Sequence, residues 1–188
     1  YPKALLPLGG ELFLTRILRL LGEAGLPRPV VVLGNAAPLI QPCIGDWPAD
    51  IRINPDPRRG QLSSIQLGME RAGPECDGAM IWPVDQPAVS ADLVRGLLEL
   101  YVSSDARIVL PACNGRRGHP ALFHRELFRE FMEAPLEQGP KGILVRHRQE
   151  TMELATEESA TVRDIDTPAD YLELTGQSLE SALAQAKA

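Results

Sequence analysis

Residues 79–87 read AMIWPVDQP, a short apolar run that ends in an aspartate between two prolines. Because the run is too short for a helix and is bounded by Asp77-Gly78 and Pro83, it predicts a buried strand. Asp85 then follows the carboxyl end of that strand, at the edge where open α/β sheets bind ligands, and a carboxylate there can hold a metal ion and its accompanying phosphates. The alternative is that Asp85 caps the helix expected from residue 91. Ser90 already supplies a good cap there, so we favour the metal-binding interpretation.

Composition sets the class of protein around this stretch. A chain of 188 residues, 44% hydrophobic and 23% charged, suits one globular domain with a sizeable core. A net charge of −6 argues against nucleic acid or an anionic membrane as a partner, since both usually require a basic face. The sequence has no apolar run near the length of about 20 residues that spans a bilayer and no signal-peptide pattern, so we expect a cytoplasmic protein. The three cysteines lack C-x-x-C spacing and predict neither disulfides nor a zinc site.

Upstream of the opening stretch, the pattern alternates between helix and strand. We expect helices over residues 11–24 and 37–43, and strands over residues 30–33 and 51–54. The strand at 30–33 reads as the second in a β-α-β alternation. We therefore expect the first strand to precede Tyr1.

A candidate ligand-binding segment follows the strand at 51–54. Gly60 frees the backbone to approach a ligand, and Ser63 and Ser64 place hydroxyl and N–H groups at the start of a helix, where anions or polar base edges bind. Serine at a helix start and glycine in a turn are also common for purely structural reasons. The segment alone leaves both interpretations equally open.

A second candidate segment is the basic loop from Asn114 to Pro120. Arg117 and His119 flank Gly118 in it, and arginine is the side chain best matched to a phosphate. The loop predicts an anion clamp, and a solvated surface turn is the equally weighted alternative.

The remaining elements continue the alternation to the end of the chain. Thr167 before Pro168 is a clear helix start, with Asp170 in the first turn. We expect helices over residues 91–101, 125–132, 143–147, 168–174 and 179–186, and strands over residues 107–111, 152–154 and 161–163.

Five separated motifs together resemble the molybdenum cofactor nucleotidyltransferase family with the MobA-like fold, and especially its cytidylyltransferase branch. The five motifs are Pro2-Lys3 followed by Leu5-Leu6-Pro7, Asn54 with residues 60–64, residues 83–87, residues 117–120 and residues 164–168. The resemblance covers nearly the whole chain and implies a Rossmann-like three-layer α/β fold, with a mostly parallel sheet and helices on both faces. It assigns residues 1–175 to the transferase domain and residues 176–188 to a helical tail. The family opens with a strand and a glycine-rich loop ending in lysine, so the resemblance implies both before Tyr1, with Lys3 as that lysine.

The resemblance also implies roles for individual residues. Asp85 and Asp166 would hold Mg²⁺ together, and Lys3 and Asp85 would be catalytic. The remaining roles are nucleotide binding by Lys3, Asn54, Gly60, Ser63 and Ser64, and acceptor binding by Arg117 and His119.

The implied reaction is transfer of CMP from CTP to the terminal phosphate of molybdopterin, or molybdenum cofactor, with release of pyrophosphate and possible hand-over to a molybdoenzyme of the xanthine dehydrogenase type. One alternative is a guanylyltransferase, or a nucleotidyltransferase for a sugar phosphate or another small phosphorylated acceptor. The other alternative is a non-catalytic carrier of the cofactor. The presence of both Asp85 and Asp166 counts against a carrier, because a carrier has no need of a metal pair.

Overall fold

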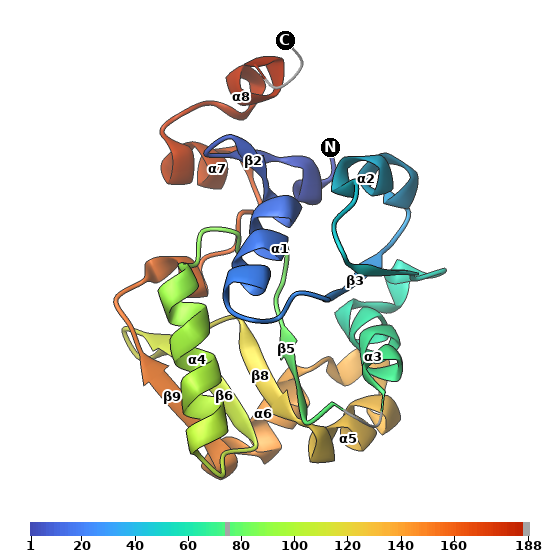
Figure 1. The fold of residues 1–188 in the computed structure, drawn as a ribbon, viewed down its shortest axis with the longest axis vertical. Helices are drawn as coiled ribbons and strands as arrows, with labels where there is room; N and C mark the ends of the chain where they lie inside the picture. Colours follow the sequence, from blue (N-terminus) through green and yellow to red (C-terminus); the bar gives the residue numbers. More distant parts are fainter. Residues whose placement is uncertain (74–75, 186–188) are drawn as a thin grey trace.

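Three sheets, with helices packed around them, make up the described part of this α/β fold (Figure 1): the β1–β2 pair, the β3–β4 pair and a sheet of five strands. The computed structural model describes residues 1–73 and 76–185. The strands are β1 Pro7–Leu8, β2 Glu11–Leu12, β3 Val30–Leu33, β4 Asp50–Ile53, β5 Gly78–Ile81, β6 Ile108–Cys113, β7 Arg116–Arg117, β8 Ala121–His124 and β9 Thr151–Ala155. The α-helices are α1 Phe13–Glu23, α2 Ala37–Ile44, α3 Gln61–Ala72, α4 Ala91–Ser103, α5 Phe128–Glu133, α6 Lys141–Arg146, α7 Pro168–Thr175 and α8 Leu179–Gln185. Short 3₁₀ helices are η1 Lys3–Leu5, η2 Pro57–Arg59, η3 Arg125–Leu127, η4 Leu136–Gln138, η5 Arg148–Glu150 and η6 Ser159–Val162.

Most of the strands run in one direction. β3 and β4 pair in parallel. In the larger sheet β8 lies between β5 and β6 and is antiparallel to both, so β5 and β6 point the same way, and β9 is parallel to β6. The predicted fold class, α/β with a mostly parallel sheet, is confirmed.

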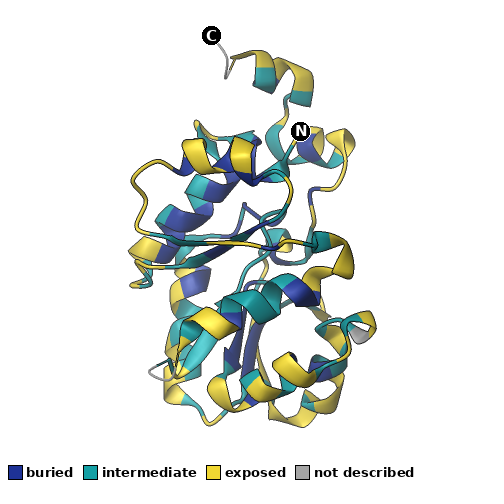
Figure 2. Ribbon diagram, turned by 90° about the vertical axis from the view of Figure 1, so that its right-hand side faces the viewer, coloured by how far each residue is buried: buried dark blue, intermediate teal, exposed yellow. Residues whose placement is uncertain are grey.

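Alternate residues of the central strands bury opposite faces of the larger sheet. Ile108 and Leu110 pack with α3, α5 and α6, whereas Val109 packs with α4. This is the period-two alternation of a strand that is buried on both faces. Figure 2 shows the resulting buried residues between the helices and the strands. Helices therefore cover both faces, as expected, and in the described part of the chain none is long and apolar enough to cross a membrane.

One of the expected strands is wrong. Residues 161–163 were expected to be extended, but Thr161 lies in η6, where its N–H and its hydroxyl both donate to the carbonyl of Glu158, at 3.1 and 2.8 Å. Three residues are too few to separate a strand from a turn by periodicity. Of the predicted tail at 176–188, residues 179–185 form α8, and residues 186–188 lie outside the described residues.

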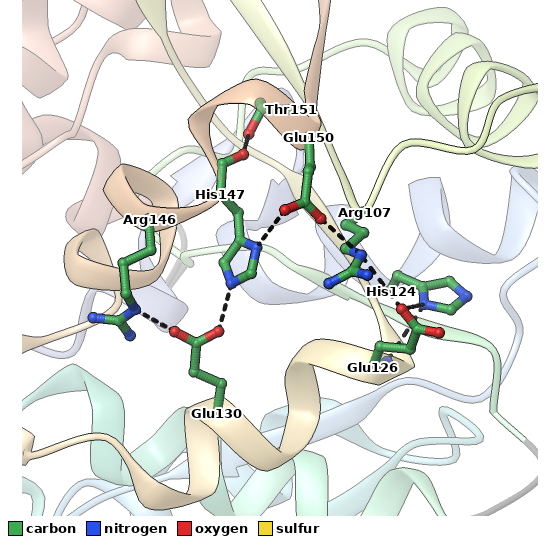
Figure 3. A network of polar contacts seen from close by, with 8 residues as sticks. All are labelled: Arg107, His124, Glu126, Glu130, Arg146, His147, Glu150 and Thr151. Atoms are coloured by element: carbon green, nitrogen blue, oxygen red, sulfur yellow. Dashed lines mark hydrogen bonds and ion pairs between the residues drawn. The ribbon is translucent and has the colours of Figure 1, made fainter.

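An ionic network fastens α5 and α6 to the amino end of β6 (Figure 3). Glu130 on α5 binds both Arg146 and His147, at 2.5 Å from Nε2 of the histidine. Glu150 then bridges His147 and Arg107, the residue before β6, at 3.3 and 2.7 Å. The network therefore lies at the end of the sheet opposite Asp85, and its role is structural.

Candidate active site

The loop after β5 is joined side by side to residues 164–166. The N–H of Ile165 donates to the carbonyl of Asp85 at 2.9 Å, and the side-chain amide of Gln86 donates to Asp164 at 2.6 Å. Trp82 holds the same loop from within, because its indole N–H donates to the carbonyl of Gln86 at 2.9 Å. These bonds join segments that are almost 80 residues apart in the sequence, and they bring the aspartates of the two predicted motifs together.

Lys3 on η1 connects the two aspartates that the sequence predicts as metal ligands. Its Nζ lies 3.1 Å from Oδ2 of Asp85 and also contacts Oδ1 of Asp166. Burial lowers the pKa of the Lys3 ammonium, but hydrogen bonds and the charges of Asp166 and Asp85 outweigh this effect and raise the pKa above its ordinary value. One cation therefore bridges two carboxylates that both remain accessible to solvent, and no backbone N–H group of the described residues is seen to donate to the Asp85 side chain as to a helix cap. Ser90 caps α4, accepting from the N–H of Leu93 at 3.1 Å.

The start of α7 fixes the position of Asp166. Thr167 is the N-cap and accepts from the N–H of Asp170 at 3.2 Å, while the Asp170 carboxylate accepts from the N–H groups of Thr167 and Asp166, at 2.7 and 3.1 Å. Pro168 occupies the first helical position, as predicted. The reciprocal capping bonds make the backbone at Asp166 rigid.

Asn54, Gly60, Ser63 and Ser64 form one cluster, as the sequence predicts. Asn54 is buried, and its amide donates to the hydroxyls of Ser63 and Ser64, at 2.8 and 3.0 Å. Ser63 donates in turn to the carbonyl of Gly60 at 2.7 Å, and Gly60 has a φ of 92°, which favours glycine. Asn54 therefore orients the serines, and among the described residues the Ser64 hydroxyl accepts from Asn54 without itself donating a bond.

His119 lies near the aspartates, whereas Arg117 is engaged elsewhere. Burial lowers the pKa of the His119 imidazole below its usual value, and the charges of Asp164 and Asp85 partly offset this. Arg117 instead pairs with Glu153 on β9, at 2.7 Å. The charges of Asp164 and Asp85 therefore act on the His119 imidazole, whereas the Arg117 guanidinium is paired with Glu153.

The packing of the loop explains the glycine between Arg117 and His119. A Cβ at Gly118 would lie 2.1 Å from the carbonyl oxygen of Thr161. The same carbonyl accepts from the N–H of His119 at 2.8 Å. Glycine is needed here because the two backbones touch, and this contact sets the position of the histidine.

Sequence reasoning missed Gln86 and its partner Asp164. Gln86 is only 4% exposed, and in the described part of the structure its buried Oε1 has no hydrogen-bond partner. Buried polar side chains are normally satisfied. A glutamine directly after Asp85, the candidate metal ligand, in a run otherwise apolar up to Val84, is the signal that could have identified it.

The comparison with family models shows the family to which the chain belongs. The model described as the MobA-like NTP transferase domain matches residues 1–151. The chain belongs to the MobA-like NTP transferase family. This MobA-like nucleotidyltransferase is 25% identical over 168 residues to a probable molybdenum cofactor guanylyltransferase of Mycobacterium ulcerans, covering 88% of this chain and 80% of the relative.

Other proteins are similar to this chain over part of its sequence or in three-dimensional structure. It is 28% identical over 116 residues to the bifunctional protein GlmU of Mycolicibacterium paratuberculosis, which is 58% of this chain but only 24% of that protein. Among solved structures, Rv0371c of Mycobacterium tuberculosis superposes with a TM-score of 0.83 and 25% identity, covering 94% of this chain and 90% of that one. A manganese complex of Rv0371c superposes with a TM-score of 0.81 and 24% identity, covering 94% and 92%.

Proposed function

We propose that this MobA-like nucleotidyltransferase transfers CMP from CTP to the terminal phosphate of molybdopterin, in the free or molybdenum-loaded cofactor, and releases pyrophosphate. The observation that carries the proposal is the single Lys3 ammonium between the carboxylates of Asp85 and Asp166. The molybdopterin acceptor is supported by the name of the relative from Mycobacterium ulcerans, which the chain matches over most of its length.

The donor set at Lys3 fits a hard divalent cation such as Mg²⁺. Asp85 and Asp166 offer carboxylate oxygens that already converge on one cation, the lysine ammonium. Mg²⁺ usually takes one or two protein carboxylates and completes its octahedral coordination with water and phosphate oxygens. A bound Mg²⁺ would neutralise charge on the triphosphate. The manganese complex of Rv0371c shows that a protein of this fold holds a divalent cation.

The residues of the chain then have separate tasks. Lys3 turns from the carboxylates to the phosphates and stabilises the charge that develops as pyrophosphate leaves. Asp85 and Asp166 stay fixed by the bonds from Ile165 and from the α7 cap. We assign His119, whose pKa responds to the charge of Asp85, to binding of the acceptor phosphate. The attack by the acceptor phosphate on the α-phosphorus is in line and needs no covalent intermediate.

We assign CTP as the donor because Ser63 and Ser64 offer short polar groups at the start of α3, which suit a small pyrimidine. GTP is the second candidate, since the relative from Mycobacterium ulcerans, which matches 88% of this chain, is named a probable molybdenum cofactor guanylyltransferase. One lost hydrogen bond to a buried group costs about 1–3 kcal/mol, so a single matched contact gives roughly a five- to hundredfold preference.

The decisive experiment supplies the protein with molybdenum cofactor, Mg²⁺ and each nucleoside triphosphate in turn, and measures pyrophosphate release. We expect release with CTP, and its loss in Asp85→Asn and Asp166→Asn, which keep the side-chain shape but lose the charge. Release with GTP alone would replace the cytidylyl assignment by a guanylyl one. Cofactor binding without pyrophosphate release from any nucleotide would refute transferase activity and support a carrier.

A further inference from the structure

The segment between β9 and α7 is bonded to two separate loops. We call residues 158–165, which include η6, the strap. One of its neighbours is the loop after β5, residues 82–90, which contains Asp85. The other is the basic loop, residues 114–120, which contains His119. The candidate metal ligand and the histidine assigned to the acceptor therefore lie in loops that share one support.

Hydrogen bonds at both ends of the strap hold it on the loop after β5. At the carboxyl end, the N–H of Ile165 donates to the carbonyl of Asp85 at 2.9 Å. At the amino end, the Glu158 carboxylate accepts from the N–H and from the hydroxyl of Ser90, at 2.9 and 2.5 Å. Hydrogen bonds to an ionised group are stronger than neutral ones. Glu158 is therefore a firm attachment of the strap to the loop.

The middle of the strap carries the histidine of the basic loop. The carbonyl of Thr161 accepts from the N–H of His119 at 2.8 Å. Thr161 is completely buried, and its own N–H and hydroxyl both donate to the carbonyl of Glu158, at 3.1 and 2.8 Å. The guanidinium of Arg116 adds a longer bond to the carbonyl of Val162, at 3.3 Å. Thr161 is thus fixed on Glu158, and His119 is fixed on Thr161.

The basic loop changes its support between two neighbouring residues. The N–H of Gly118 donates to the carbonyl of Pro111 on β6 at 2.8 Å, whereas the N–H of His119 donates to the strap. Arg117 is paired with Glu153 on β9. The sheet therefore positions the loop as far as Gly118, and the strap positions the backbone of His119.

Glu158 is the residue at which the two connections meet. Its side chain binds Ser90, and its carbonyl binds Thr161. A simpler role for Glu158 is to fix the start of α4, since the Ser90 hydroxyl also accepts from the N–H of Leu93 at 3.1 Å. That role involves Ser90 alone and does not use the bonds from Thr161. The two roles therefore differ in their effect on His119.

The electrostatic surroundings of the histidine also depend on the strap. Burial lowers the pKa of the His119 imidazole, and the charges of Asp164 and Asp85 partly offset this effect. Asp164 belongs to the strap, and the carbonyl of Asp85 is bonded to the strap through Ile165. Displacement of the strap would therefore change the surroundings of His119 together with its position.

We propose that Glu158 is a positioning residue for a phosphorylated acceptor, acting through Thr161 to set the position of His119 relative to Asp85. The inference rests on the proposed function in one respect, namely that His119 binds the acceptor phosphate. A displacement of about 1 Å can slow a reaction by about 100-fold, so the strap matters even though it does not touch the substrate.

Amide hydrogen exchange of Glu158→Ala tests the position of His119 without any substrate. The substitution removes both bonds from Ser90, so we expect the His119 amide to exchange at least about 10-fold faster than in the unchanged protein. The Gly118 amide, which is bonded to β6, should keep its rate and is the internal control. Glu157→Ala makes the same change at the exposed neighbouring glutamate and should alter neither amide.

Steady-state kinetics of pyrophosphate release separate positioning from stability. With molybdenum cofactor as the acceptor, Glu158→Ala should raise KM for the acceptor by about 10-fold. KM for the nucleotide should stay within about twofold, since the Asn54 cluster is held by bonds of its own. Glu158→Gln should restore KM for the acceptor, because its side-chain oxygen can accept from the Ser90 N–H and its amide can donate to the Ser90 hydroxyl. A purely structural role would not raise only one of the two KM values.

Three results would overturn the proposal. The first is a His119 amide that exchanges at the same rate in Glu158→Ala and in the unchanged protein. The second is an equal acceleration of the Gly118 and His119 amides, which would mean that Glu158 stabilises the fold in general. The third is faster exchange at His119 with no change in KM for the acceptor. Absence of pyrophosphate release from the unchanged protein would instead refute the proposed function, and exchange at the His119 amide would still decide whether Glu158 positions the histidine.

Discussion

Replacing Gln86 by leucine should separate the positioning of the aspartates from the stability of the fold. The change removes the bond of 2.6 Å to Asp164, and a hydrogen bond to a charged group is worth about 1.5–3 kcal/mol. It also removes the buried Oε1, which has no partner among the described residues and costs about 1–3 kcal/mol to bury. Leucine is close to glutamine in volume. The two terms offset each other, so the free energy of unfolding should change by less than about 1.5 kcal/mol.

Unlike the stability of the fold, the affinity for the metal ion should decrease in Gln86→Leu. With the Gln86 bond gone, the loop after β5 loses one of its two direct hydrogen bonds to residues 164–166 among the described residues, and the Ile165 bond remains. Loss of residues that orient metal ligands typically weakens metal binding by about 10–100-fold. We therefore expect Gln86→Leu to weaken Mn²⁺ binding by that factor.

The assay is a Mn²⁺ titration followed by electron paramagnetic resonance, with urea unfolding of the same samples. Asp164→Asn is the matched control, because it removes a charge but keeps an oxygen that accepts from Gln86, so it should retain most of the affinity. Unchanged Mn²⁺ affinity in Gln86→Leu would refute the reasoning. So would a loss of stability above about 3 kcal/mol, which would mean that Oε1 is satisfied in solution.

Three further outcomes are expected. Lys3→Met should bind Mn²⁺ more tightly in the absence of nucleotide, because Asp85 and Asp166 lose a competing cation. The same substitution should lower kcat by about 100-fold or more. Weaker Mn²⁺ binding in a titration of Lys3→Met would contradict the first expectation. Gly118→Ala should lower the urea midpoint by an amount equivalent to about 1–3 kcal/mol, while Gly22→Ala, with open space around its Cβ, should not; equal midpoints would disprove the contact with the Thr161 carbonyl. Burial raises the pKa of the Glu130 carboxyl, but His147 and Arg146 outweigh this effect and lower the pKa. The stabilisation that Glu130 provides is therefore present above the unfolded pKa of about 4.5 and is lost as the pH falls. In unfolding measurements between about pH 3 and 7, the difference in stability between the unchanged protein and Glu130→Gln should shrink toward the acid end.

Local signals were sufficient for many of the elements but not for β8 or for residues 161–163, and the pairing of Asp85 with Asp166 was implied only by the family resemblance. The strand at 30–33 and the caps at Ser90 and Thr167 follow from nearest-neighbour chemistry, and the structure has each of them. Partner choice did not follow from the sequence. Arg117 binds Glu153, because β6 lies between β7 and β9 and brings both side chains together, and no pattern in the basic loop reveals that neighbour.

Asn54 shows a further limit of the sequence. The family resemblance implies that it contacts the nucleotide, yet its side-chain amide donates to Ser63 and Ser64. The count of donors and acceptors around a buried amide depends on the fold, so the sequence can place Asn54 in the site without revealing that it acts through the serines.

Packing of the carboxyl-terminal helix α7 against the amino-terminal segment positions Asp166 next to Lys3. Tyr171 of α7 is buried against Phe13, with ring centroids 6.2 Å apart, and its hydroxyl donates to the carbonyl of Pro7 at 2.5 Å. These contacts tie α7 to the segment that follows Lys3. Apolar packing therefore brings two distant ends of the chain together, and the attraction between Lys3 and Asp166 is a consequence of that packing, since an exposed ion pair alone contributes at most about 1 kcal/mol.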